Sequence, residues 1–371
     1  MKKDWTYKVF EDCIEKVKYT TKLQSKDYLA NGDYPIISQE EELISGYWNN
    51  ASDVFCVERP LVVFGDHTRV LKYVDFDFVL GADGVKILLP IQELGAKFLY
   101  YFLKWYNVPN LGYSRHYKLL KEISLPIPPL SDQELIVREL DAIHGILEKK
   151  QEQLRLLDHL AQAIFYDMFG DPITNPKQWE VKKLIDIVHK DCPVSYGIVQ
   201  PGDGEIDGVP VVRPIDLKET GYITKEELKL TTKEISDSYS RTILRGNEIL
   251  ICVRGTTGLL GLVSHELKGC NVTRGIVPLF FAEDVANKQF MYAALKTDAI
   301  QGVITDKTYG ATLKQINIKD LREIEFPLPP LSLQQSFAAK IEAIEAQKTA
   351  IRQSIREVEA LLAERMDHYF A

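Results

Sequence analysis

The sequence lacks the signs of several kinds of protein. None of its five cysteines stands in a Cys-x-x-Cys pair, which speaks against a zinc ribbon or a thioredoxin-type site and favours reduced thiols in or near the core. No apolar run approaches the ~18 residues that a membrane helix needs, and no apolar stretch follows the lysines at the start. We therefore expect no signal peptide, no membrane partner and a cytoplasmic location.

The sequence also lacks catalytic motifs. An amino-methyltransferase holds its flipped base with an Asn/Asp-Pro-Pro-aromatic loop, and Asn175-Pro176-Lys177 does not match that type. No Gly-x-Gly-x-x-Gly opens a βαβ unit, and no Gly-Lys-Ser/Thr phosphate loop is present. Glu180 and Lys182 resemble half of a metal nuclease site without a partner carboxylate, and the histidines form no metal-binding pair. We expect no catalytic residue, no metal and no cofactor on this chain.

The composition is that of an ordinary globular protein. The chain has 371 residues, 45% hydrophobic and 26% charged, which is enough for two or three domains. The formal net charge of -8, with an isoelectric point of about 5.5, argues mildly against a nucleic-acid partner. The positions of the charges matter more than their sum, and we expect the acidic residues to gather on Glu40–Glu42 and on the helices, away from any basic face that could bind nucleic acid.

An internal duplication organises the chain. Residues 123–169 align with residues 324–370 without a gap, at a constant offset of 201. Each copy begins with a proline-rich strand exit and continues as a heptad pattern. Ser131 and Ser332 are the expected N-caps, and a glutamine follows each near the position of a capping-box partner.

The heptads predict two helices of about 39 residues, each roughly 58 Å long. Lys150 and Lys348 interrupt the apolar seams. The other seam positions include Ile136, Leu140, Ile143, Leu147, Leu154, Leu157 and Ile164 in the first copy, and Phe337, Ile341, Ile344, Ile351, Ile355, Val358 and Leu362 in the second. The simplest arrangement is an antiparallel coiled coil of the two helices. The alternative is that each helix packs as an amphipathic helix on its own domain.

The segments around these helices are diverged copies of one mixed α/β globule. Tyr34–Ser38 parallels Val209–Arg213, and Pro60–Gly65 parallels Glu248–Gly255, as apolar β-branched runs typical of strands. The fold class is α/β (mixed α+β) with a pseudo-two-fold repeat. The expected domains are a first globule, a central helix, a second globule and a C-terminal helix, at residues 1–125, 126–170, 171–326 and 327–371.

This order resembles the specificity subunit of type I restriction-modification systems over essentially the whole chain. The specific motifs are the duplicated Pro-x-Pro-Pro-Leu-Ser-x-Gln segment with its helix and the opening from Trp179 to Leu184. Gly246–Leu250 and Val253–Gly255 are similar to the family's Gly-Asp-Ile-Leu-x-x-x-Arg-Gly phrase, with Asn247 in place of aspartate. The first globule departs further from this phrase, with Gly65-Asp66-His67-Thr68-Arg69.

The resemblance implies a function without catalysis. Each globule would be a target-recognition domain for one half of a split, asymmetric site on double-stranded DNA. The helices would set the distance between the halves and dock two methyltransferase subunits, which a restriction motor subunit can join. S-adenosylmethionine, ATP and Mg²⁺ would belong to those partner subunits.

Donor-rich and glycine-bearing loops supply the candidate DNA contacts. Glycine lets the backbone approach a phosphate, and arginine can bridge O6 and N7 of guanine. The plain alternative for each loop is a turn with no ligand. The candidates are Ser38, His67, Thr68, Arg69, Arg115, His116 and Lys118 in the first globule, and Arg213, Arg254, Thr256, Thr257, Arg274 and Lys314 in the second.

Two other functions remain open on sequence grounds. The chain could be a restriction enzyme or methyltransferase with a site of its own, although the required motifs are missing. It could also be a coiled-coil scaffold that binds no DNA, which would leave the two diverged globules without a purpose.

Overall fold

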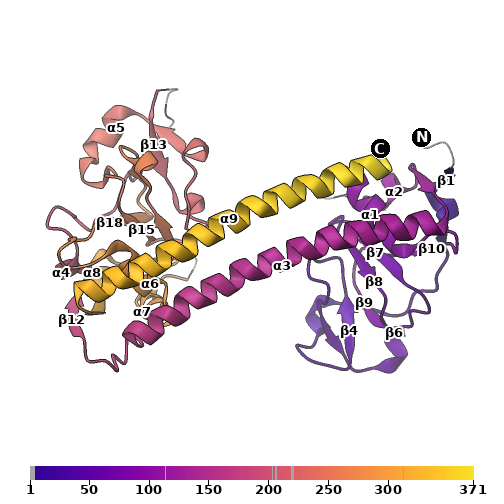
Figure 1. Ribbon diagram of the computed structural model, residues 1–371, viewed down its shortest axis with the longest axis horizontal. Coiled ribbons are helices and arrows are strands. Elements are labelled where there is room, and N and C mark those ends of the chain that lie inside the picture. The colour runs from indigo at the N-terminus through magenta and orange to yellow at the C-terminus, as the bar shows by residue number, and fades with distance from the viewer. Residues whose placement is uncertain (1–4, 113, 203, 205–206, 219–220, 312) are drawn as a thin grey trace. The chain divides into compact units, whose positions relative to one another are not determined.

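The computed structural model divides the chain into two compact units, Met1–Glu152 with Ile351–Ala371 and Gln153–Ala350 (Figure 1). Two helices of 40 residues, α3 (Leu130–Phe169) and α9 (Leu331–Phe370), contribute a segment to each unit. The residues that the structure describes are 5–112, 114–202, 204, 207–218, 221–311 and 313–371.

The first unit contains short strands and two shorter helices beside its segments of α3 and α9. The strands are β1 (Thr6–Val9), β2 (Ile14–Glu15), β3 (Lys22–Leu23), β4 (Tyr34–Ile37), β5 (Gly46–Trp48), β6 (Val54–Phe55), β7 (Leu61–Gly65), β8 (Leu71–Val74), β9 (Phe78–Gly81), β10 (Val85–Pro90) and β11 (Ser124–Ile127). The helices are α1 (Ala96–Tyr106) and α2 (Tyr117–Leu120), with 3-10 turns at η1 (Phe10–Cys13), η2 (Ser25–Asp27) and η3 (Ala51–Asp53).

The second unit has the same kind of content. Its strands are β12 (Glu180–Lys183), β13 (Val209–Val212), β14 (Lys229–Thr231), β15 (Ile249–Cys252), β16 (Leu260–Leu262), β17 (Asn271–Val272), β18 (Ile276–Leu279), β19 (Thr308–Tyr309), β20 (Gln315–Ile316) and β21 (Glu325–Leu328). Its other helices and 3-10 turns are α4 (Leu184–Ile187), α5 (Lys233–Ser238), α6 (Lys288–Lys296), α7 (Asp298–Asp306), α8 (Ile318–Arg322), η4 (Pro214–Asp216), η5 (Lys225–Glu227), η6 (Ser240–Thr242) and η7 (His265–Leu267).

A strand buried on both faces lies at the centre of each unit. In the first, β7 pairs with β8 and β10 in the sheet β2-β10-β7-β8. Leu61 and Val63 face one apolar cluster, while Val62 and Phe64 face another. Because both faces are covered, the strand is a continuous apolar run and not an alternating one. The second mixed sheet of this unit has the order β3-β9-β4-β5, with β6 on β9.

Strand β15 has the corresponding place in the second unit. It lies between β16 and β18, antiparallel to both. Ile249 and Ile251 face one apolar cluster, and Leu250 and Cys252 face another. A further sheet has the order β14-β13-β17. The sequence predicted that Pro60–Gly65 and Glu248–Gly255 correspond to each other. In the structure both segments contain a strand that is buried on both faces.

The duplicated segments build the same frame in both units. Strand β1 pairs antiparallel with β11, and β12 pairs antiparallel with β21, so each globule begins and ends on one two-stranded ribbon. In the first unit, the side-chain amide of Gln133 accepts from Gly95 N at 2.8 Å and donates to the carbonyls of Glu93 and Pro128, both at 2.8 Å.

The second copy repeats this arrangement. Gln334 accepts from Asn287 N at 2.8 Å and donates to Pro329 O at 2.8 Å and Val285 O at 3.4 Å. Asn287 is the N-cap of α6, just as Gly95 is that of α1. The duplicated glutamine therefore ties the start of each long helix to a shorter one. The expectation of a capping-box role for it was wrong.

The expected serine N-caps are also wrong. The helices begin at Leu130 and Leu331, which places Ser131 and Ser332 inside the first turn. The carbonyl oxygens of Pro129 and Pro330 accept the first helical bonds, from Asp132 N and Leu333 N, each at 2.9 Å. The prolines that end the preceding strand thus also start the helix.

The predicted heptad seams form the less exposed faces of α3 and α9. Ile136, Leu140, Ile143, Leu147, Phe337 and Ile344 are buried, and the remaining apolar seam positions are half-buried. Exposed residues such as Leu135, Ile146 and Leu156 stand between them. The predicted period of 3.5 residues is confirmed through both helices.

The two helices are antiparallel in both units. In the first unit, early residues of α3 contact late residues of α9, for example Glu139 with Arg365. In the second, Phe165 and Phe169 near the end of α3 pack edge-on against Phe337 near the start of α9, with ring centroids 5.7 and 5.3 Å apart. In each unit the start of one helix contacts the end of the other helix. The two helices are therefore antiparallel, as the sequence predicted.

Lys348 shows how a polar seam position is satisfied. It is 7% exposed, and its Nζ donates to Asp158 at 2.8 Å and Glu345 at 2.6 Å. Burial works to lower the pKa of this amine, but the two carboxylates outweigh that effect and the pKa is raised. Lys150, the other interruption of the seam, is half-buried.

Candidate nucleic-acid interface

The loop that follows β7 carries the first group of predicted residues. It connects β7 to β8 as a hairpin, and Arg69 stands there in the left-handed region with φ of 65°. Arg69 Nη1 donates to Val108 O at 2.9 Å, and Thr68 Oγ1 donates to Gln39 O at 2.6 Å. Thr68 is exposed, while His67 and Arg69 are half-buried. The hairpin thus presents Thr68 to solvent and anchors Arg69 to the neighbouring segment.

His116 has a structural place in this region. It is fully buried, and its Nε2 accepts from Leu111 N at 3.0 Å while its Nδ1 lies 3.0 Å from Asp66 O. An acceptor at Nε2 and a donor at Nδ1 describe the neutral imidazole. The predicted direct DNA contact of His116 therefore becomes a positioning role, because the ring joins the loops that carry Asp66 and Arg115. Arg115 and Lys118, its neighbours, are exposed.

Ser38 is buried as well, at 2% exposure. Its hydroxyl lies 2.7 Å from Ser45 Oγ, and its carbonyl accepts from Lys72 Nζ at 3.0 Å. Lys72 also donates to Glu42 O, and burial lowers the pKa of Lys72. A hydroxyl enclosed in this way holds the loop between β4 and β5, so the predicted contact of Ser38 with DNA is corrected to a role in positioning that loop.

The same loop places acidic residues beside the candidates. Gln39 accepts from His67 N at 3.4 Å through Oε1 and from Thr68 through its carbonyl, and the exposed run Glu40–Glu42 follows it directly. The expectation that this run lies away from the candidate residues was wrong. Glutamate can accept a hydrogen bond from cytosine N4, so acid here is compatible with base contact.

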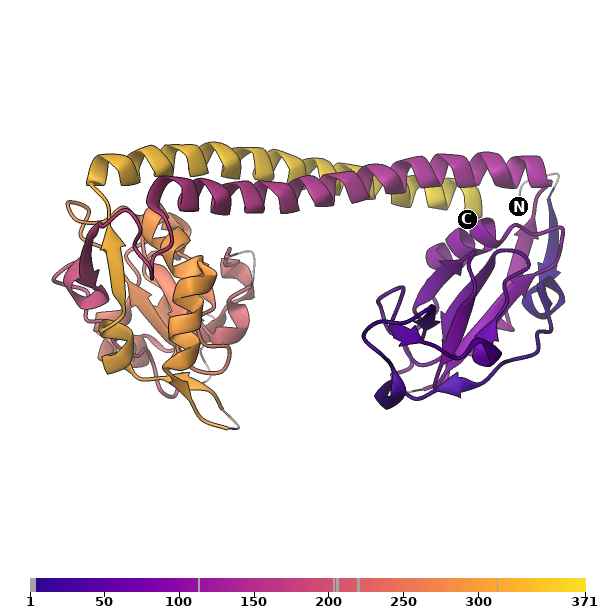
Figure 2. The same ribbon diagram turned by 90° about the horizontal axis from the view of Figure 1, so that it is seen from below.

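In the second unit the candidate residues gather at the end of β15. Arg254 forms a β-bridge with Gln315, Gly255 N donates to Lys314 O at 2.8 Å, and Ile316 N donates to Val253 O at 3.0 Å. These bonds join the end of β15 to the hairpin of β19 and β20. Within this unit the hairpin lies at the opposite end from the segments of the long helices (Figure 2).

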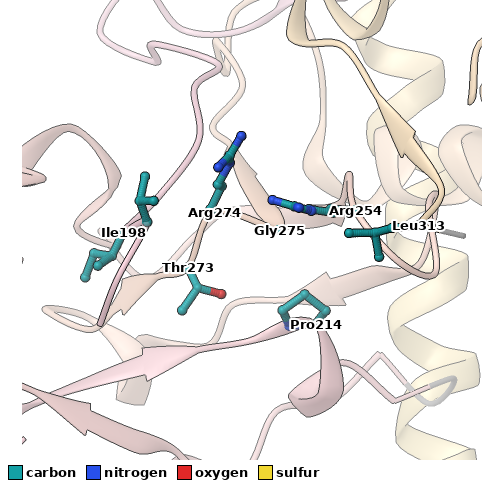
Figure 3. Close-up of a pocket in the computed structure, with 8 residues that line it drawn as sticks. Ile198, Pro214, Arg254, Thr273, Arg274, Gly275 and Leu313 are labelled. Atoms are coloured by element: carbon teal, nitrogen blue, oxygen red, sulfur yellow. The ribbon is translucent and has the colours of Figure 1, made fainter. Parts of the chain in front are cut away.

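Arg254 and Arg274 line one hollow of about 350 Å³ (Figure 3). Pro214, Thr273, Gly275 and Leu313 line it too, together with Ile198 and Val199. Arg274 is exposed and Arg254 half-buried, and Arg274 N donates to Ile198 O at 2.8 Å. Over the part of the chain that the structure describes, neither guanidinium is paired with a carboxylate. Two cations without counter-ions in one hollow suit phosphate oxygens or the acceptors of guanine.

The other predicted residues of this unit divide into exposed and engaged ones. Thr256 and Lys314 are exposed near the same strand end, whereas Thr257 Oγ1 lies 3.1 Å from Thr308 Oγ1. Arg213 is engaged: its Nε and Nη2 donate to the two carboxylate oxygens of Asp216, at 3.0 and 2.8 Å. The structure thus brings Arg254, Arg274 and Lys314 to one end of the unit and commits Arg213 to an ion pair.

Sequence reasoning missed the residues that shape this hollow. Pro214 stands directly after a predicted contact, and Leu313 directly before another. The signal for the engagement of Arg213 was present, because Asp216 follows it at the i, i+3 spacing of a capped turn. Tyr113 and Thr312, which lie two residues before the predicted contacts Arg115 and Lys314, are outside the described residues.

The described residues form neither a metal site nor a membrane span. No group of three or more His, Cys, Asp or Glu side chains that could hold a metal ion occurs in the described ranges. Among those same residues, no helix combines the length and the apolar character needed to cross a membrane.

Comparison with known proteins places this arrangement in a family. The sequence profile described as "Type I restriction modification DNA specificity domain" matches residues 2–156 and 176–360. Over 261 residues the chain is 24% identical to the specificity subunit of type I restriction enzyme EcoBI from Escherichia coli, covering 64% of this chain and 55% of that protein. It is 23% identical to the EcoR124I/EcoR124II specificity subunit from the same organism, covering 93% and 88%.

The chain thus matches about half of the length of the EcoBI subunit. A solved structure, the type I restriction-modification system S subunit from M. genitalium, is 16% identical, with 98% of this chain and 96% of that one covered and a TM-score of 0.54. That likeness supports the fold. With the profile matched over both halves, the chain belongs to the family of type I restriction modification DNA specificity domains.

Proposed function

We propose that this chain is the DNA-reading subunit of a type I restriction-modification complex. Residues 1–125 read one half of a bipartite, asymmetric site, and residues 171–326 read the other. The long helices set the spacer and dock two methyltransferase subunits, which a restriction motor subunit can join. The observation that carries the proposal is the hollow with Arg254 and Arg274, two cations without described carboxylate partners at the end of the buried central strand β15.

The chain contributes recognition and no chemistry in this proposal. S-adenosylmethionine, ATP and Mg²⁺ belong to the partner subunits. The absence of the corresponding motifs from the sequence supports this division, and so do the names of the relatives, which are specificity subunits. Neither an enzyme with its own site nor a scaffold without DNA is favoured by a particular feature of the structure.

The test compares the chain alone with the chain mixed with its methyltransferase subunits. We expect no methylation or cleavage by the chain alone with S-adenosylmethionine or Mg²⁺, and adenine methylation by the mixture. Long-read sequencing of DNA from a host that carries the system then gives the methylated sequence, and gel shifts on that duplex measure binding. Methylation or cleavage by the isolated chain contradicts the proposal, and a mixture that assembles without binding DNA favours a scaffold.

A further inference from the structure

The turn that contains Ile215 is fixed from both sides. Arg213 and Asp216 close it by their ion pair, and Asp216 Oδ2 also accepts from Arg213 N at 2.8 Å. Pro214, the first residue of the 3-10 turn η4, sets its own φ through the ring. A Cβ added at Gly275 would come within 2.5 Å of Pro214 Cγ, so the turn rests directly on the segment that follows Arg274.

This turn exposes Ile215 to solvent. The residue is 78% exposed, the largest exposed fraction of any large hydrophobic residue that the structure describes. Single exposed apolar residues are ordinary on protein surfaces. An isoleucine in a braced turn is different, because its position is determined before any partner arrives, and a preorganised contact costs less entropy on binding.

The surroundings of Ile215 indicate what covers it. Pro214, its neighbour in the chain, lines the hollow of Arg254 and Arg274. Val199 and Leu313 line the same hollow and are 49% and 45% exposed. The surface therefore combines exposed aliphatic carbon with guanidinium groups that pair with no carboxylate among the described residues. In the DNA major groove the same combination exists as guanine acceptors or phosphates beside the C5 methyl group of thymine.

We propose that Ile215 contacts the C5 methyl group of a thymine in the half-site read by residues 171–326. The contact lies beside the bases or phosphates that Arg254 and Arg274 bind, so Ile215 is a specificity-determining residue and Arg213 and Asp216 position it. The inference rests on the proposed function, since it needs DNA at this surface. It adds a particular chemical group to what this unit recognises.

The experiment uses the full chain assembled with its methyltransferase subunits and a synthetic duplex carrying the mapped sequence. Each thymine of the second half-site is replaced in turn by uracil, which lacks only the methyl group. We expect one replacement to weaken binding about fourfold, the effect of burying one methyl-sized group. Ile215→Ala should weaken binding to the thymine duplex by roughly 4- to 10-fold and should remove the difference between thymine and uracil at that position. Ile173→Ala is the matched control, an isoleucine 54% exposed in another turn of the same unit.

Distinct results would overturn the inference and its premise. If the wild-type complex binds the duplex but Ile215→Ala leaves the thymine preference intact, Ile215 does not read the methyl group. If Ile215→Ala impairs assembly with the methyltransferase subunits and leaves the methylated sequence unchanged, a protein covers Ile215 and the inference is wrong. If the wild-type complex binds no DNA, the proposed function fails first. Asp216→Asn should reproduce part of the Ile215→Ala effect, because it loosens the turn without removing the isoleucine.

Discussion

Two arginines of the second unit illustrate how local partners decide the use of a side chain. Arg213 and Arg254 both follow apolar strands, and the sequence offers them as equivalent candidates. Asp216 accepts hydrogen bonds from Nε and Nη2 of Arg213, and this hydrogen bonding raises the pKa of the guanidinium. Arg254 has no such partner within the described residues. The guanidinium of Arg254, next to Gly255, can therefore reach a base edge. The guanidinium of Arg213 is held by Asp216 and fixes the backbone of its turn.

Replacing Arg254 therefore tests recognition directly. If the guanidinium bridges a guanine, Arg254→Ala should weaken binding to the second half-site by roughly 1–3 kcal/mol and relax the sequence at one position. The measurement is the methylated motif from long-read sequencing, together with gel shifts at fixed salt. Arg241→Ala removes an equal charge from an exposed site of the same unit and should leave the motif unchanged.

Equal weakening of both half-sites, or a loss of solubility alone, would contradict a direct base contact by Arg254. If Arg254→Ala instead weakens binding to all second half-site sequences equally, and lowers the slope of log binding constant against log salt concentration by about one, Arg254 contacts a phosphate.

At the scale of single residues, the sequence predicted the presence of the loops better than the exposure of each side chain in them. It indicated the loops after both central strands, and both are present. It assigned Ser38 and His116 to DNA because hydroxyls and imidazoles are donors, but both are buried and hold loops. Burial depends on tertiary neighbours such as Lys72 and Asp66, which are distant in the sequence and follow no periodic pattern.

The duplicated glutamine is the main link between elements at the start of each long helix. Gln334 is fully buried, and its amide satisfies Asn287 N and Pro329 O. A buried polar group that loses its partner costs about 1–3 kcal/mol. Gln334→Leu should therefore lower the free energy of unfolding by roughly 2–4 kcal/mol.

Urea denaturation followed by circular dichroism measures this change. Gln335→Leu, at an exposed position of the same turn, is the matched control and should change the stability little. Equal stabilities for the two variants would show that the amide contributes nothing to the attachment of α6.

A second link between the helices depends on pH. Glu139 on α3 accepts from Arg365 and Tyr369 on α9, and the hydrogen bond from Arg365, followed by that from Tyr369, holds its pKa below the ordinary value of 4.5. A carboxylate with a lowered folded-state pKa contributes stability above the ordinary value, and this stability is lost as the pH falls through the lowered one. The wild type should thus lose stability on acidification below about pH 4.5 more steeply than Glu139→Gln.

Thermal unfolding of the two proteins between pH 3 and pH 7, a range chosen to bracket the carboxylate pKa values, gives the comparison. Glu134→Gln, on the exposed face of the same helix, should follow the wild type. Parallel pH profiles for the wild type and Glu139→Gln would mean that this ion pair is screened and contributes little, as many exposed pairs do.

The helices with a strong heptad period could be predicted from the sequence, but the residues at which they begin could not. The two helices and their seams follow from the heptads, because one apolar face must be covered along the whole length. Their N-caps were placed at Ser131 and Ser332, a local signal, whereas the helices begin at Leu130 and Leu331, after prolines whose carbonyls accept the first helical bonds. The short strands are set by pairing between distant segments such as β1 and β11, which no local pattern specifies.

On the scale of the whole molecule, the duplication explains why the chain contains two globules that are built on the same plan. Each long helix runs without a break from one unit into the other, and each unit is completed by segments of both helices. A change in one globule therefore leaves the frame of the other intact, while a change in the helices affects both. The helices are the place to test how the two half-sites are spaced.

Adding one heptad to each helix, near Lys150 and near Ile351, keeps the seam in phase because seven residues restore the same face. Seven residues lengthen a helix by roughly 10 Å. DNA rises about 3.4 Å per base pair, so the spacer of the methylated site should grow by about three base pairs. The half-site sequences should stay the same, because no reading residue has moved relative to its own globule.

Long-read sequencing of methylated DNA from hosts with the original and the lengthened chain makes this comparison. An insertion of two residues per helix is the control, since it turns the apolar seam away from its partner by about 200° and should prevent correct pairing. A heptad variant that is folded and active on the original spacer would show that helix length does not set the distance between the half-sites. A spacer that grows while both half-sites persist would identify the helices as the element that measures it.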